Sequence, residues 1–295
     1  MADLPTFAAP LDGRLNAKML SAFDDTGVII LREFAEPAAC ATLRAHTVQM
    51  VERDAPEAAE SIFSTKTNSQ LSDDYFIKSG GNISFFFEEE TRRVSAQNVS
   101  GGDRAKMDRL NKIGHAMHDL DPVFDAFSRT AKLAAAAASL GFKDPKLVQS
   151  MYIVKPPGIG GEVVCHQDST YLYTEPQSCV GFWFAIDEAT EANGCMEFLP
   201  GTHKGPLREL NSRRTDGKLS TRMIDETPFP EVEPVPAPAM PGDLVIFHGR
   251  APHMSAANRS NEARHAYTLH VVEGSSRWPA ENWLQRPPEL PFRGF

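Results

Sequence analysis

The spacing of hydrophobic residues changes about halfway along this chain. Up to about residue 145, apolar residues recur mainly at helical intervals, and local signals such as Asp25-Thr26-Gly27, Asp121-Pro122 and Gly141 mark where helices begin and end. This pattern predicts a buried strand at residues 28–31 and helices over residues 15–24, 36–52, 104–120, 121 onward and 130–140.

In the second half the apolar runs are short, and glycine, proline and asparagine separate them. Such runs are typical of the strands of an antiparallel barrel. They predict strands over residues 148–154, 163–166, 180–186, 195–199, 243–247 and 266–272.

The segment between the first helices and residue 104 is polar and irregular apart from two short runs. Residues 75–78 and 83–87 predict a hairpin across Ser79-Gly80-Gly81-Asn82, and the following Glu88-Glu89-Glu90 indicates a solvated turn. On the predicted helix 104–120, His115 is expected in the core and His118 on the surface.

Helices followed by strands predict one α+β domain, mostly β, over residues 1–295. Residues 1–145 are expected to form mainly helical support and a lid, and residues 146–290 the barrel core. The proline-rich stretch within residues 204–241 lies between predicted strands, so we interpret it as a long excursion over the barrel mouth and not as a domain linker.

Composition narrows the possible partners. Hydrophobic residues make up 41% of the 295 residues, which is ample for a core, and the formal net charge is −9. This charge, with no dense run of Lys or Arg, argues against a nucleic-acid partner, whereas a small molecule, even an anionic one, remains compatible. The oligomeric state is left open.

The location expected from the sequence is cytoplasmic. The four cysteines are widely spaced, without metal-binding pairs or disulfide density, so they indicate reduced thiols. No signal sequence and no apolar window of about 18 residues is present, so no membrane association is expected.

The candidate chemistry centres on His166 and Asp168. Residues two apart on a strand project to the same face, so this imidazole and this carboxylate would form two corners of a metal site. A second histidine would complete a facial triad, which leaves positions open for a co-substrate and oxygen on Fe(II). His248 and His253 are both candidates, and we favour His253.

Arg264 follows on the returning strand and is expected to face the same cavity. A buried arginine there could bind the distal carboxylate of 2-oxoglutarate through a bidentate pair. The alternative is a surface ion pair with Glu262. By alternation His270 could share the face of Arg264, although we favour a hydrogen-bonded core histidine.

Several motifs occur in order along the chain: Met151-Tyr152-Ile153-Val154-Lys155-Pro156-Pro157, His166-Gln167-Asp168, Asn193-Gly194-Cys195, Pro200-Gly201-Thr202-His203-Lys204-Gly205, and His253 followed by Arg264. With Asn111-Lys112-Ile113-Gly114-His115-Ala116 and Leu172-Tyr173-Thr174-Glu175-Pro176, they resemble the phytanoyl-CoA dioxygenase family of Fe(II)/2-oxoglutarate oxygenases. The likeness is greatest to the phytanoyl-CoA dioxygenase domain-containing proteins.

This resemblance implies a double-stranded β-helix, a jelly-roll or cupin-like barrel with N-terminal and flanking helices. It also implies Fe(II), 2-oxoglutarate as co-substrate and O2. The implied iron ligands are His166, Asp168 and His253, and the implied 2-oxoglutarate contacts are Lys112, Met151, Gln167, Trp183, Ser255 and Arg264. The match at Trp183 depends on a gap after Asp168, and strand alternation turns Gln167 away from the metal face.

The function that the resemblance implies is an Fe(II)- and 2-oxoglutarate-dependent dioxygenase. It would hydroxylate a small molecule while 2-oxoglutarate is decarboxylated to succinate and CO2. Related halogenases carry a small residue where this chain has Asp168, which favours an oxygenase outcome. The alternative is a non-catalytic cupin-like metal- and dicarboxylate-binding or sensor protein. The substrate stays open between an acyl-CoA and another small molecule, with residues 64–95 and 204–241 expected to line its side of the site.

Overall fold

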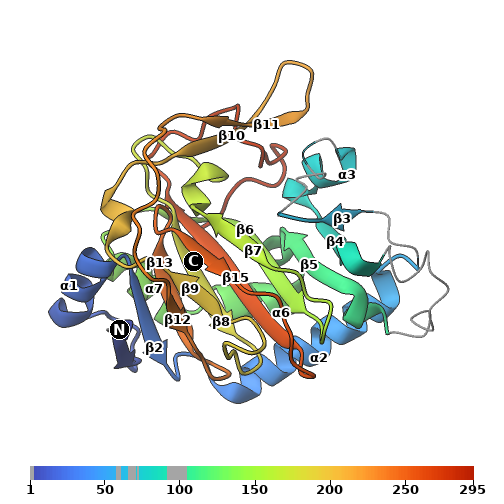
Figure 1. Cartoon of the computed structure of the whole chain (residues 1–295), viewed down its shortest axis with the longest axis horizontal. Coiled ribbons are helices and arrows are strands. Elements are labelled where there is room, and N and C mark those ends of the chain that lie inside the picture. The colour runs from blue at the N-terminus through green and yellow to red at the C-terminus, as the bar shows by residue number, and fades with distance from the viewer. Residues whose placement is uncertain (1–2, 58–60, 66–70, 72, 92–104) are drawn as a thin grey trace.

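The structure is a computed structural model that describes residues 3–57, 61–65, 71, 73–91 and 105–295. Two β-sheets and a set of helices form its layers (Figure 1). Most of the helices pack on the outer face of the larger sheet, and the smaller sheet faces its inner side. The short helix at Asp74–Ile77 packs instead in a separate cluster with Phe86 and Trp283.

The larger sheet has nine strands in the described part of the chain. In spatial order they are β1 (Thr6–Ala8), β2 (Val28–Arg32), β13 (Leu244–His248), β8 (Val180–Ala185), β15 (Arg264–Glu273), β6 (Pro145–Lys155), β5 (Leu110–His115), β4 (Ile83–Glu88) and β3 (Ile62–Phe63). All pairings from β2 to β4 are antiparallel, and β1 and β3 join parallel at the two edges.

The smaller sheet consists, in order, of β12 (Val235–Ala237), β9 (Met196–Phe198), β14 (His253–Ser255) and β7 (Val163–His166). Between the sheets, Trp183 and Phe247 of the larger sheet share one buried cluster with Met196 and Phe198 of the smaller one. Strands β6, β7, β8, β9, β13 and β15 lie where the short apolar runs predict them, whereas β12 and β14 were not predicted as strands. The expected α+β, mostly β class is confirmed, with two facing sheets in the manner of a double-stranded β-helix.

The side chains of strand β2 show that the larger sheet is covered on both faces. Its side chains alternate between faces: Val28 and Ile30 belong to the cluster between the sheets, whereas Ile29 and Leu31 belong to the cluster under the helices. A strand buried on both faces is continuously apolar, which is how the sequence of residues 28–31 reads.

The helices are α1 (Ala17–Thr26), α2 (Pro37–Asp54), α3 (Asp74–Ile77), α5 (Met117–Leu120), α6 (Pro122–Ser128) and α7 (Ala131–Ser139). Local signals fix their ends as predicted. The Asp121 carboxylate caps α6 by accepting from the backbone N–H groups of Val123 and Phe124. Gly27 ends α1 at φ 77°, a left-handed conformation that glycine adopts without strain.

The helix predicted over residues 104–120 is wrong, although residue 104 itself lies outside the described residues. The chain forms a 3-10 turn at Lys106–Arg109, strand β5 and the single turn α5. Strand β5 lies between β4 and β6, and a register shift in its pairing with β4 brings Leu110 and Ile113 to the same face. These two apolar residues are three positions apart, which is a helical spacing.

The predicted hairpin at residues 75–87 is also wrong. Its first arm is helix α3, because Asp73 caps it by accepting from the N–H of Tyr75, and β4 pairs with β5 instead. The acidic run is not wholly solvated, since Glu88 is buried at the end of β4. His118, expected on the surface, is fully buried.

Residues 204–241 were predicted as a long excursion over the barrel mouth, but they contain three strands. They form the hairpin of β10 (Glu209–Arg213) and β11 (Leu219–Met223), and then β12 joins the smaller sheet. Residues 1–145 form helices and also strands β1 to β5 of the larger sheet. The predicted helical part (1–145) and the predicted barrel part (146–290) therefore share one sheet. No helix in the described residues is both long enough and apolar enough to span a membrane.

Candidate metal and dicarboxylate site

Two histidines face each other across the smaller sheet. His166 ends β7 and pairs directly with His253, which begins β14. Their ring centroids are 4.3 Å apart. His248, the other candidate for the second histidine ligand, lies at the end of β13 beside His203 and is not close to His166 and Asp168 in the way that His253 is.

The same backbone contact orients both rings. The Nδ1 atom of His166 lies 2.9 Å from the Val164 carbonyl oxygen, and Nδ1 of His253 lies 3.0 Å from that of Ala251. A carbonyl only accepts, so each Nδ1 carries the hydrogen and donates it. Each Nε2 then keeps its lone pair, which is the form of imidazole that binds a metal.

Asp168 supplies the third corner. Strand β7 ends at His166, but Gln167 keeps an extended backbone and Asp168 begins a 3-10 turn at Asp168–Thr170, so the side chains of residues 166 and 168 still share a face. The Asp168 Oδ1 atom lies 3.4 Å from Nε2 of His166 and 3.7 Å from Nε2 of His253. Its other oxygen, Oδ2, lies 2.8 Å from Nε2 of His270.

Electrostatics keep the Asp168 carboxylate ionised. Burial alone would raise its pKa, but the nearby His270 and His253 rings and the hydrogen bond from His270 outweigh burial and hold the pKa well below its usual range. Burial, with His166 close by, lowers the pKa of His253 to about 4. An ionised carboxylate and a neutral imidazole are both competent metal ligands.

The three side chains fit a divalent iron ion. Their ligand atoms all lie within 4.8 Å of one another, and no other such group of His, Cys, Asp or Glu occurs in the described part of the chain. Two imidazole nitrogens and one carboxylate oxygen on one side of the ion form the donor set of non-haem Fe(II) oxygenases.

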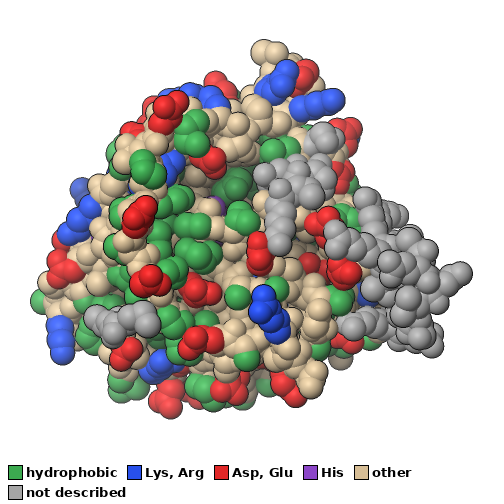
Figure 2. Space-filling view, in the orientation of Figure 1, with side chains coloured by type: hydrophobic (Ala, Val, Ile, Leu, Met, Phe, Trp, Pro, Cys, Tyr) green, Lys and Arg blue, Asp and Glu red, His purple; other side chains and the backbone are tan. Residues whose placement is uncertain are grey.

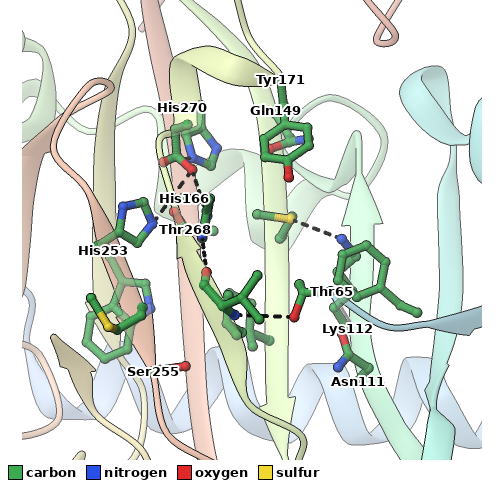
Figure 3. A pocket seen from close by; sticks show the side chains of 18 of the residues that line it. Thr65, Asn111, Lys112, Gln149, His166, Tyr171, His253, Ser255, Thr268 and His270 are labelled. Carbon is green, nitrogen blue, oxygen red and sulfur yellow. Dashed lines mark hydrogen bonds and ion pairs between the residues drawn. The ribbon is translucent and has the colours of Figure 1, made fainter. Parts of the chain in front are cut away.

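These side chains line a cavity of about 180 Å³ between the two sheets. Near the centre of the face seen in Figure 2, a histidine is visible between hydrophobic side chains. In Figure 3, His166, His253 and His270 lie on one side of the cavity, and Lys112 and Asn111 lie on the other. The predicted contacts that also line it are Met151, Trp183, Ser255 and Arg264.

Arg264 begins β15 and is buried, with 2% of its surface exposed. Its Nε and Nη1 atoms have no hydrogen-bond partner, and it forms no ion pair with a described carboxylate, which excludes the alternative pairing with Glu262. Burial lowers the pKa of Arg264 to about 10, so it stays charged near neutral pH. A buried cation without an anion is costly, and the unpaired Arg264 atoms belong to a side chain that lines the cavity.

Lys112 is the second buried cation of the cavity. Its Nζ lies 3.8 Å from the Met151 sulfur and 3.4 Å from the centroid of the Phe63 ring. Burial lowers the pKa of Lys112 to about 7, because no described carboxylate offsets the desolvation. A dicarboxylate bound here would supply the missing negative charge.

Gln167 does not lie with the other predicted contacts. Its amide nitrogen donates to the carbonyls of Pro206 and Arg250, and its amide oxygen accepts from the N–H of Arg208. It is not among the residues that line the cavity. The alternation that brings His166 and Asp168 together turns the intervening side chain to the opposite face, so a contact between Gln167 and 2-oxoglutarate is not supported.

Sequence reasoning underrated or missed other residues of the cavity. His270 lies on the same face of β15 as Arg264, as alternation allows. It is a buried, hydrogen-bonded histidine as expected, but its hydrogen-bond partner is the proposed metal ligand Asp168. Gln149 precedes Met151 by two positions on β6, so the same alternation signals it. Tyr171 follows the Asp168 turn and has no comparable signal.

The amino-acid sequence of this chain is similar to those of known proteins along most of its length. The profile of the family described as phytanoyl-CoA dioxygenase (PhyH) matches residues 23–266. The chain is 41% identical over 288 residues to phytanoyl-CoA dioxygenase 1 of Oryza sativa subsp. japonica, covering 95% of this chain and 98% of that protein. It is 39% identical over 279 residues to phytanoyl-CoA dioxygenase domain-containing protein 1 of Danio rerio, covering 92% and 94%.

Solved structures share the fold at lower identity. The non-haem α-ketoglutarate-dependent carbocyclase SnoK from nogalamycin biosynthesis superposes with a TM-score of 0.64 at 15% identity, covering 97% of this chain and 100% of that one. EctD from S. alaskensis, solved with 2-oxoglutarate and 5-hydroxyectoine, gives 0.64 at 19% identity, covering 98% and 91%. These likenesses concern the fold and confirm the jelly-roll architecture.

Proposed function

Because the chain belongs to the phytanoyl-CoA dioxygenase family and is therefore an Fe(II)- and 2-oxoglutarate-dependent dioxygenase, we propose that it hydroxylates a small molecule at a site formed by His166, Asp168 and His253. In the proposed reaction 2-oxoglutarate, O2 and a substrate C–H bond give succinate, CO2 and a C–OH group. One oxygen atom enters succinate and the other enters the product.

One observation carries the site assignment. The cavity that holds the His166, Asp168 and His253 group also holds Arg264 and Lys112, two buried cations that have no carboxylate partner in the described residues. A metal site beside unpaired cations is the arrangement that a metal-chelating dicarboxylate requires.

Each residue has a distinct part in this scheme. His166, Asp168 and His253 hold iron on one side, and bound iron supplies the redox chemistry between 2-oxoglutarate and oxygen. Arg264 and Lys112 bind the distal carboxylate of 2-oxoglutarate, and they orient it along the cavity. Trp183, which lies 5.6 Å from the Arg264 guanidinium, and Ser255 and Met151 line the space between. The two sheets exclude water around the reacting groups.

Asp168 supports hydroxylation over halogenation. A halogenase of this type needs a small residue at the position of the carboxylate ligand, so that chloride can bind there. In this chain the position carries an ionised carboxylate that faces both histidines.

A small substrate is favoured by the cavity itself. The Lys and Arg residues that line it, among those described, are Lys112, Lys155 and Arg264. Lys155 donates to the carbonyls of Gly161 and Ala256 and is committed to the scaffold. No basic side chain of the described lining is left to hold the diphosphate of an acyl-CoA. Of the segments expected on the substrate side, residues 66–70, 72 and 92–95 lie outside the described residues.

We also retain a cytoplasmic location, which the four free cysteines support. The proposed partner is a small molecule, and the negative net charge gives no reason to add a nucleic acid.

The experiment is a screen of small molecules and acyl-CoA thioesters for stimulated consumption of 2-oxoglutarate, followed by mass spectrometry of the product under isotopically labelled O2. A true substrate should gain one labelled oxygen atom, and succinate should gain the other. Stimulated turnover without labelled oxygen in the product would contradict hydroxylation. Metal and 2-oxoglutarate binding with no oxygen consumption for any candidate would favour the non-catalytic binding protein.

A further inference from the structure

His270 touches the proposed metal site without belonging to it. It lies on β15, six residues after Arg264, and the two side chains share one face of the strand. Only 2% of its surface is exposed. Its Nε2 atom lies 2.8 Å from Oδ2 of Asp168, across 102 positions of sequence (Figure 3).

The two oxygens of the Asp168 carboxylate therefore have separate neighbours. Oδ1 faces Nε2 of both His166 and His253, at 3.4 and 3.7 Å. Oδ2 is bonded to His270. A carboxylate that offers both oxygens can take two positions on a metal, whereas one with an engaged oxygen offers a single ligand atom.

Hydrogen-bond chemistry fixes the direction of this contact. An ionised carboxylate only accepts, so the hydrogen lies on Nε2 of His270 and points at Oδ2. The other ring nitrogen, Nδ1, is buried and has no partner among the described residues. An apolar ring of similar shape would fill this space without leaving a polar atom unpaired, so simple packing does not account for a histidine here.

We propose that His270 is a positioning residue that engages Oδ2 of Asp168 and so presents Oδ1 as a single-atom ligand to iron. The inference rests on the proposed function, because it takes Asp168 as an iron ligand. Its consequence is that a bound iron ion would keep more coordination positions available for 2-oxoglutarate and oxygen than it would with a two-oxygen Asp168 ligand. Strand β15 then carries both the clamp for the distal carboxylate, Arg264, and the support for the metal ligand.

The inference is tested by titrating the full-length protein with Co(II) alone, without 2-oxoglutarate or oxygen. Calorimetry gives the affinity, and the ligand-field absorption of Co(II) reports its coordination. The His270→Phe variant removes the hydrogen bond and should bind Co(II) about 10- to 100-fold more weakly, with a changed absorption spectrum. The His270→Gln variant keeps an N–H donor and should recover most of the affinity and the wild-type spectrum.

The matched control is His265→Gln. His265 lies on the same strand and is equally buried, but its ring contacts the Tyr152 hydroxyl and not a proposed metal ligand. This variant should bind Co(II) as the wild type does. Thermal unfolding of each metal-free variant shows that the comparison is made between folded proteins.

Three results would overturn the inference. These are wild-type affinity and spectrum in His270→Phe, equal losses in His270→Phe and His270→Gln, or an equal loss in the His265→Gln control. Failure of the proposed function looks different, because the wild type and an Asp168→Ala variant would then bind Co(II) equally well.

Discussion

His166 and His253 occupy directly opposed positions on β7 and β14, and their rings lie 4.3 Å apart between the two strands. Both rings are held by the carbonyl oxygen two residues earlier. The two proposed nitrogen ligands therefore come from neighbouring strands of one sheet, and the carboxylate comes from the turn that follows the first strand. A metal bound by all three would tie these elements together.

Metal binding should accordingly stabilise the fold. At a Co(II) concentration of about one hundred times its dissociation constant, mass action adds about 2.7 kcal/mol to the free energy of unfolding. Thermal unfolding with Co(II) and with excess chelator measures this difference as a rise in Tm. The His253→Ala variant should show little or none of the rise. An equal rise in that variant would mean that the metal binds elsewhere.

Replacing Arg264 should weaken 2-oxoglutarate binding and leave metal binding intact. Its unpaired Nε and Nη1 atoms are available to the distal carboxylate, and a hydrogen bond to a charged group contributes about 1.5–3 kcal/mol. We expect Arg264→Gln to raise the Kd for 2-oxoglutarate about 10- to 100-fold, measured by anaerobic titration of the metal-loaded protein. Co(II) affinity is the internal control, and an unchanged Kd for 2-oxoglutarate would remove Arg264 from the site.

Lys112 should make the ligand-free protein less stable as the pH falls towards neutrality. Burial lowers the pKa of Lys112 from 10.5 to about 7, so between these values the unfolded chain binds a proton that the folded protein does not. Stability therefore rises with pH across this window. Lys112→Met removes the effect. Its gain in unfolding free energy over the wild type should be larger at pH 7 than at pH 9 by about 2 kcal/mol. A gain independent of pH would show that Lys112 keeps an ordinary pKa.

Glu88 should make the protein less stable as the pH rises, which is opposite to the effect of Lys112. Burial, only partly offset by the Gly161 N–H and Asn111, raises the pKa of Glu88 from 4.5 to about 7. The folded protein holds a proton that the unfolded chain loses between these values, so stability falls as the pH rises. The Glu88→Gln variant should gain more over the wild type at pH 8 than at pH 5, by about 2 kcal/mol. Denaturant unfolding at the two pH values measures this, and Glu89→Gln, at the partly buried neighbouring position, serves as the comparison. Equal gains at both pH values would contradict the raised pKa of Glu88.

The parts of the fold that depend on local rules were predictable from the sequence. The strand period of two brought His166 and Asp168 to one face, and it also turned Gln167 away. The Asp121 cap and Gly27 fixed helix ends through contacts within a few residues. These features need no knowledge of distant parts of the chain.

The parts that failed depend on which strands become neighbours. Residues 110–115 became a strand because β4 and β6 flank them, and the register shift against β4 placed Leu110 and Ile113 on one face at a spacing of three, which hid the strand period. The contact of His270 with Asp168 likewise requires the β15 and β7 segments to meet across the cavity. Periodicity shows the face on which a side chain lies, but it does not show which residue lies opposite.

The most direct test of the central claim is succinate formation by the purified protein supplied with Fe(II), 2-oxoglutarate and oxygen, compared with a His166→Ala variant. The wild type should form succinate in a reaction that requires all three additions. The variant should lose that activity while keeping a wild-type thermal unfolding profile in the presence of chelator. Succinate formation by His166→Ala at the wild-type rate would contradict the assignment of His166, Asp168 and His253 as the catalytic iron site.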